Sequence, residues 1–252
     1  MIYHYTSLES LACILESRCL RFTRLDLDDD PKEYSFIKDG FNPAKYVYVS
    51  CWTESQEETI PQWKMYGNNG KGVRIAIKPD VFNIIEDDKY RLLFPLDYFV
   101  DKDYIIMPDL GKNNQPLYKI NYINDLHYAK GKMFLDDSID FKEVAIYKGP
   151  EWSFQKECRF ILYVLPKSVG DKSYSPQQAV LRRLIPNHNY LDIPICYTAY
   201  NSIQITLGPS SYAEELILRS LLKKYLGHEN FDKSVFTYSI SKYWCPLKLK
   251  NR

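Results

Sequence analysis

Short stretches of the chain either alternate apolar and polar residues or consist almost entirely of apolar residues. Stretches of this kind, when rich in β-branched and aromatic residues, are typical of β-strands. The clearest is CRFILYVL, at residues 158–165. The predicted strands are residues 2–5, 20–22, 46–52, 73–78, 90–100, 158–165, 202–207 and 235–240.

Other stretches repeat apolar residues at the spacing of a helix. Residues 212–225 carry the most regular stripe, and Thr6 and Glu9 have the spacing of a capping box for an early helix. Pro31, with Asp30 as its cap, predicts another helix start. The predicted helices are residues 8–15, 31–39, 59–66, 79–85, 120–137, 177–184 and 212–225. Because strands and helices do not alternate regularly, we predict a single α+β domain over residues 1–252, with a split or mixed sheet and flanking helices.

Composition narrows the class of protein. Hydrophobic residues make up 45% of the 252 residues and charged residues 26%, which excludes a disordered chain. The formal net charge of +1 does not indicate a nucleic-acid or membrane binder. The six cysteines form no C-x-x-C pair, and no apolar run approaches the roughly 18 residues that a membrane span needs. We therefore expect a soluble, reduced, cytoplasmic protein.

Two segments in the first part of the chain, residues 4–6 and residues 63–66, carry candidate chemistry. His4, Tyr5 and Thr6 stand where a strand meets a helix, where free backbone N–H groups can hold a sugar or phosphate. The alternative is a partly buried histidine beside a helix cap. Trp63 and Tyr66 share a helix face and could stack on a flat heterocycle, or simply form a core stripe.

Acidic residues lie on both sides of Pro31. Asp28, Asp30 and Glu33 could bind a divalent metal, although the spacing is not that of an EF-hand. A structural role explains two of these acids, because Asp30 can cap a helix with Glu33 at its third position.

Glu157 lies at the start of the strongest predicted strand. A partly buried carboxylate there could stabilise positive charge that develops on a sugar carbon. The alternative is a surface carboxylate paired with Lys156 or Arg159, which would contribute little.

Together these segments resemble a bacterial family catalogued as domain of unknown function 2971. The stretches that carry the resemblance run from residue 3 to about residue 240: YHYTSLESLACILESRCLRFTR, DDPKE, YVSCWTE, PQWKMYGNNGKGVRIAI, EWSFQKECRF and ITLGPS. The family's name assigns no activity.

The opening His-x-Thr and the later Gln-x-Glu also resemble ADP-ribosyltransferases of the DNA-modifying toxin type. That resemblance implies an ADP-ribosyltransferase-like fold and NAD as substrate, with no metal. It implies that Glu157 promotes loss of nicotinamide and that His4 holds the ribose. It assigns NAD or substrate contacts to Tyr5, Thr6, Arg21 (at the pyrophosphate), Ser50, Trp52, Trp63, Tyr66 (one of the last two stacking on nicotinamide) and Gln155.

The expected function is therefore that of an NAD-dependent ADP-ribosyltransferase-like protein, with a role as a toxin or anti-phage effector. Its acceptor and its oligomeric state stay open. One alternative is a non-catalytic module that binds a nucleotide or a protein. Another is a metal-dependent nuclease using Asp28, Asp30 and Glu33. Sensitivity to EDTA separates the nuclease from the transferase, and turnover of NAD separates the transferase from the binding module.

Overall fold

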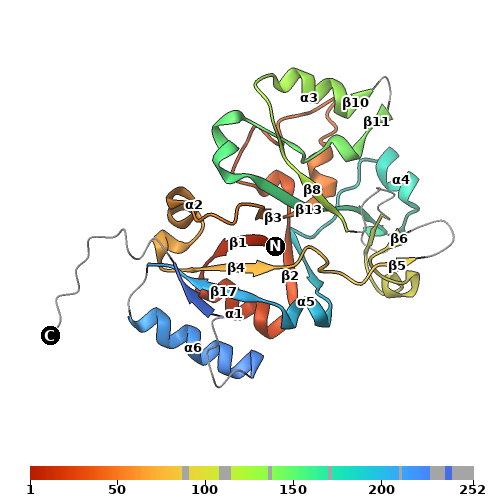
Figure 1. The fold of residues 1–252 in the computed structure, drawn as a ribbon. Coiled ribbons are helices and arrows are strands. Elements are labelled where there is room, and N and C mark those ends of the chain that lie inside the picture. The colour runs from red at the N-terminus through yellow and green to blue at the C-terminus, as the bar shows by residue number, and fades with distance from the viewer. Residues whose placement is uncertain are drawn as a thin grey trace. The chain divides into compact units, whose positions relative to one another are not determined.

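The computed structural model describes residues 1–86, 91–107, 115–135, 138–169, 172–209, 212–227 and 236–239. The chain is a mixture of helices and strands (Figure 1), and the predicted α+β class is confirmed. It forms two compact units, each assembled from separate stretches. The first unit comprises Met1–Leu20, Trp52–Val81 and Pro194–Arg252, and the second comprises Arg21–Cys51 and Phe82–Ile193. The prediction of a single domain stays a prediction.

A sheet forms the centre of the first unit. Its strands are β1 (Ile2–Thr6), β4 (Val73–Ile77), β17 (Gln204–Leu207) and β18 (Phe236–Tyr238), in that order. β4 runs antiparallel to both β1 and β17, whereas β17 and β18 are parallel. Every residue of β4 is buried, because this strand lies between two others.

The helices of this unit are α1 (Leu8–Ser17), α2 (Ile60–Met65), α5 (Tyr197–Asn201) and α6 (Tyr212–Leu226). The capping prediction for α1 is wrong by one residue. β1 continues through Thr6, and the Ser7 hydroxyl accepts the hydrogen bond from the Ser10 amide. The predicted helix at residues 79–85 is also wrong, because these residues form bends, irregular backbone and the start of the short strand β5 (Ile85–Glu86).

In the second unit the long strand β13 (Glu157–Pro166) pairs with β3 (Val47–Thr53), β7 (Tyr104–Ile106) and β8 (Leu117–Lys119). β2 (Cys19–Arg24) pairs with β3, and β16 (Tyr190–Pro194) follows β2 in the strand order. The helices are α3 (Leu126–Met133) and α4 (Pro176–Leu181). Short pairs complete this unit: β5 with β6 (Arg91–Leu92), β9 (Asn121–Tyr122) with β12 (Tyr147–Lys148), β10 (Phe134–Leu135) with β11 (Ser138–Ile139), and β14 (Ser168–Val169) with β15 (Lys172–Ser173).

Two predicted helices of this unit are wrong in extent or in kind. Residues 31–39 form turns and irregular backbone. Residues 136–137 lie outside the described residues, and residues 120–135 contain β9 and the eight-residue α3 in place of one long helix. Residue 90 of the predicted strand at residues 90–100 lies outside the described residues, and the rest contains β6 and a 3-10 helix at Leu96–Phe99.

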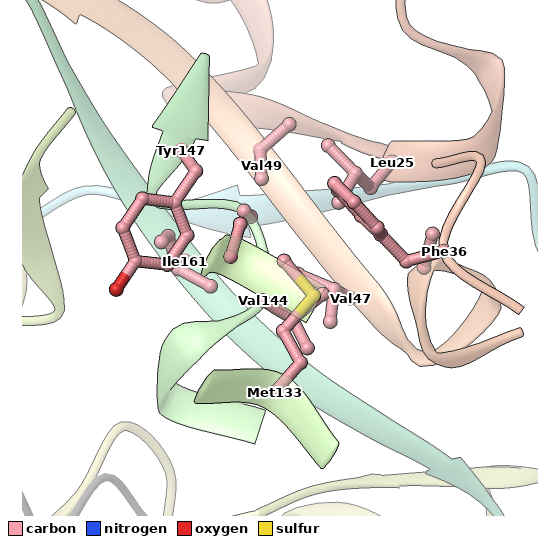
Figure 2. Packing of buried hydrophobic residues seen from close by; sticks show 11 residues of the cluster. Leu25, Phe36, Val47, Val49, Met133, Val144, Tyr147 and Ile161 are labelled. Carbon is pink, nitrogen blue, oxygen red and sulfur yellow. The ribbon is translucent and has the colours of Figure 1, made fainter. Parts of the chain in front are cut away.

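Apolar side chains from distant segments form a core inside this unit. Figure 2 shows Val47 and Val49 of β3 packed with Ile161 of β13 and Met133 of α3. Fully burying an aliphatic side chain of this size stabilises a fold by about 1.5–3 kcal/mol. This packing therefore holds in place the strand start that carries Glu157.

Candidate functional site: a buried ion cluster in the second unit

The residues expected to contact NAD are divided between the two units. Those of the first unit are His4, Tyr5, Thr6, Trp52, Trp63 and Tyr66, and those of the second are Arg21, Ser50, Gln155 and Glu157.

The first group consists largely of packed aromatic side chains. The His4 and Trp52 ring centroids are 5.1 Å apart, and Tyr5 meets Trp63 edge-on at 4.8 Å. Trp63 is only 2% exposed, and its indole N–H donates to Glu58. Trp63 therefore belongs to the packed interior of the first unit, as the core interpretation of its sequence expects.

In the second unit, the backbone before β13 places Glu157 inside the protein. A 3-10 helix at Pro150–Gln155 ends at Lys156, whose positive φ of 44° turns the chain into the strand. The Glu157 amide then donates to the Tyr122 hydroxyl at 2.8 Å. Because side chains two residues apart share one face of a strand, Glu157 and Arg159 point the same way.

We define the ion cluster as Asp28, Glu33, Lys148, Glu157 and Arg159. The Arg159 guanidinium donates through Nε to Glu157 and through both terminal nitrogens to Glu33, and its Nη2 lies 3.4 Å from Asp28. Lys148 Nζ lies 3.0 Å from Glu157 Oε2 and 3.1 Å from Glu33 Oε1. The side chains of Arg159, Glu33, Glu157 and Lys148 are at most 6% exposed. All four carboxylate oxygens of Glu33 and Glu157 therefore face a cation.

Two side chains border this cluster. Gln155 accepts from Lys148 Nζ at 3.1 Å, so the predicted Gln-x-Glu pair shares one ammonium group. The same Nζ lies 4.9 Å from the centre of the half-buried Trp152 ring, within the range of a cation–π contact.

The pKa values of the two buried carboxyl groups in the cluster shift in opposite directions. Desolvation by burial, the largest influence on Glu157, raises its pKa, but Arg159 and Lys148 together outweigh burial and lower it to about 2. Burial also raises the pKa of Glu33, and there Arg159 and Lys148 do not compensate for it. With Asp28, the cluster holds three carboxylates against two cations, so keeping the second buried carboxyl ionised costs more than the first. Glu157 is ionised at neutral pH.

The acidic run does not form the helix start that we expected. The Asp30 carboxylate accepts from the Lys32 amide at 3.0 Å within a turn, while Glu33 faces Arg159 and Lys148. Within the ranges that the structure describes, no group of three His, Cys, Asp or Glu side chains is placed to hold a metal ion. The nuclease alternative therefore gains no support from these residues.

Arg21 and Ser50 have separate surroundings. Arg21 forms a bidentate pair with Asp192, at 2.8 and 2.9 Å, and lies over the Tyr190 ring. Ser50 is buried within β3.

Sequence reasoning missed Lys148 and the partnership of Glu33 with Arg159. Lys148 belongs to a two-residue strand, which is too short to show a periodic pattern. Glu33 and Arg159 are 126 positions apart, so no local pattern links them.

No helix of the described chain is long and apolar enough to cross a membrane. Comparison with curated proteins and with solved structures finds no significant match. The resemblance to ADP-ribosyltransferases therefore rests on the sequence motifs alone. The model of the family described as Protein of unknown function (DUF2971) matches residues 62–160, a stretch that contains Lys148, Gln155, Glu157 and Arg159, and this match supports the resemblance to that family.

Proposed function

We propose that the chain is an NAD-dependent ADP-ribosyltransferase-like enzyme with Glu157 as its catalytic carboxylate. The observation that carries the proposal is the ionised Glu157 carboxylate, held out of bulk water beside Gln155 at the start of β13. The resemblance of the Gln-x-Glu segment to bacterial transferases supplies the reaction. An ADP-ribosyltransferase-like fold and a role as a toxin or anti-phage effector belong to the same proposal.

In the proposed reaction, Glu157 stabilises the positive charge that develops on the ribose of NAD. The bond between the nicotinamide nitrogen and ribose C1 breaks, its electron pair leaves with nicotinamide, and positive charge develops on the sugar. A carboxylate that accepts a hydrogen bond from the ribose 2′-hydroxyl stabilises this charge, and it does so more strongly in a dry site than in water. The acceptor's nucleophile then bonds to C1 and loses its proton.

Glu157 can accept a hydrogen bond from the ribose 2′-hydroxyl if Lys148 releases one of its carboxylate oxygens. Its ammonium group contacts Glu157, Glu33 and Gln155. If Lys148 releases Glu157 Oε2, it still keeps two oxygen partners, so the release does not leave a buried cation alone. We therefore assign Lys148 the part of a positioning residue.

Arg159 and Lys148 contact every carboxylate oxygen of Glu33 and Glu157. This favours a second candidate function, a module that binds a nucleotide or a protein without turnover. In that candidate the cluster is a structural brace, because every oxygen of both carboxylates already faces a cation.

The deciding experiment measures nicotinamide release from NAD by the purified full chain, with EDTA present and with cell lysate as a source of acceptors. We expect release by the wild type and a loss of at least a hundredfold in Glu157→Gln. Glu33→Gln is the matched control, since it makes the same chemical change in the same buried cluster.

Thermal unfolding of both variants separates catalysis from folding. Glu157→Gln removes an ionised carboxylate that Arg159 and Lys148 stabilise, so it lowers Tm. Burial raises the pKa of Glu33, so Glu33→Gln lowers Tm less. If only Glu157→Gln loses turnover, Glu157 has a catalytic role. Parallel losses of turnover and Tm in both variants, or saturable NAD binding with no release by the wild type, would favour the brace and the binding module.

A further inference from the structure

A pocket of about 440 Å³ lies on the sheet of the first unit, and its lining contains none of the residues that the sequence nominated. Its floor is one face of β1, β4 and β17, three strands labelled in Figure 1. Tyr3, Ala76 and Gln204 are register partners across these strands, and Arg74 pairs in the same way with Thr206. The small side chain of Ala76 stands between the two larger ones. A volume of this size suits a small metabolite.

Arg74 is the unusual group of this pocket. Its residue is 8% exposed, and its guanidinium lies 4.5 Å from the centre of the Tyr3 ring and 5.9 Å from that of Tyr5. Nη1 donates to the Gln56 carbonyl at 2.9 Å. Its Nε is buried and has no hydrogen-bond partner among the residues that the structure describes. Arg74 also lines the pocket, so its guanidinium can donate to an oxygen of a bound molecule.

The other lining residues indicate whether the ligand oxygen that accepts from Arg74 is charged or neutral. Glu57 and Glu58 line the pocket on the loop before α2, and their two negative charges outweigh that of Arg74. A phosphate or carboxylate ligand would meet this repulsion. Gln204 and the hydrogen-bonded pair Thr206 and Thr237 line the floor. Carboxylates accept, a guanidinium donates, and amides and hydroxyls do both.

We propose that this pocket binds a neutral, hydroxyl-rich small molecule, namely a sugar unit that is free or carried by a nucleoside. A hydroxyl group can accept from Arg74 and at the same time donate to Glu57 or Glu58, and neighbouring hydroxyls meet Gln204 and Thr206. The assignment is independent of Glu157 and of NAD turnover.

Ligand-observed NMR titrations of the full chain with D-ribose, D-glucose, adenosine, adenine and inorganic phosphate test the assignment. We expect saturable binding of ribose, glucose or adenosine. The double variant Glu57→Gln/Gln204→Ala changes two exposed lining residues and should weaken that binding at least tenfold. Glu54→Gln is the control, because Glu54 is an exposed acid of the same loop that does not line the pocket.

The results separate the sources of the sugar. Binding of a free sugar assigns the pocket to monosaccharides, and binding of adenosine without either free sugar assigns it to nucleosides. Four outcomes overturn the proposal: no saturable binding of the three sugar probes, binding unchanged in the double variant, adenine bound as tightly as adenosine, or phosphate bound more tightly than all three. None of them bears on nicotinamide release, so this proposal and the transferase proposal can fail separately.

Discussion

Among the residues that the structure describes, each unit buries one arginine, and the surroundings of these two arginines differ. In the second unit, Arg159 is fully buried, and two carboxylates, Glu33 and Glu157, surround its guanidinium. In the first unit, Arg74 lies on the rings of Tyr3 and Tyr5 and donates to the Gln56 carbonyl, and its Nε has no acceptor within the described part of the chain. The first arrangement compensates the arginine charge with carboxylates, whereas the second surrounds it with aromatic rings and a backbone carbonyl.

Of the substitutions considered, we expect Arg159→Met to lower the stability of the fold the most. Arg159→Met leaves Glu33 and Glu157 as buried carboxylates with Lys148 as their remaining cation in the cluster. Removing one partner of a buried ion pair typically costs about 3–5 kcal/mol. Arg74→Met loses the cation–π contacts with Tyr3 and Tyr5 and the hydrogen bond to the Gln56 carbonyl, and we expect it to lower the free energy of unfolding by about 1–2 kcal/mol. Urea unfolding at neutral pH measures both free energies of unfolding.

A double variant shows whether stranded charge is the cause. Adding Glu33→Gln to Arg159→Met removes one of the uncompensated carboxylates, so part of the lost stability should return. If Arg74→Met proves as destabilising as Arg159→Met, or if the double variant is less stable than Arg159→Met, charge compensation does not distinguish the two arginines.

The stability that the ion cluster contributes should also depend on pH. The folded pKa of Glu157, about 2, lies below its ordinary value of 4.5. Its ion pairs therefore stabilise the fold above pH 4.5, and this contribution disappears as the pH falls from 4.5 toward 2. A shift of this size corresponds to about 3 kcal/mol. Between those pH values, wild-type stability should fall toward that of Glu157→Gln.

For Glu33→Gln, the difference in stability from the wild type should change with pH in the opposite direction. Because burial raises the folded pKa of Glu33, its protonation on acidification relieves a cost, so the wild type should gain stability relative to Glu33→Gln as the pH falls. Unfolding free energies across the acid range measure both differences. Identical pH dependence of the two variants would contradict the asymmetry within the cluster.

The same contrast explains which parts of the fold could be predicted. The strands around residues 73–78 and 158–165 and the helix at residues 212–225 have strong local patterns, and all three are present. The predicted helix at residues 31–39 had equally suitable local signals at Asp30 and Pro31. It is absent because Glu33, the residue expected to complete the cap, instead contacts Arg159. A long-range ion pair there overrides a local preference.

The candidate site shows the same limit. Glu157 could be identified as a carboxylate at a strand start, and its pairing with Arg159 was one of the alternatives. Its depth was not predictable, because burial depends on β12 and on the turn that holds Glu33, which are distant in sequence. The roles expected for His4 and Glu157 in handling NAD stay predictions.

The smallest expected effect on stability concerns a third arginine, Arg21, which is exposed. Its pair with Asp192 joins side chains that are 54% and 39% exposed, and exposed pairs contribute up to about 1 kcal/mol. Arg21→Ala should therefore barely change the free energy of unfolding, which makes it a clean probe of the expected pyrophosphate contact. If the chain turns over NAD, we expect Arg21→Ala to raise KM for NAD severalfold with little change in kcat. Asp192→Asn is the matched control, because it removes the competing carboxylate and should leave KM unchanged or lower it. An unchanged KM in Arg21→Ala would show that Arg21 pairs with Asp192 for structural reasons alone.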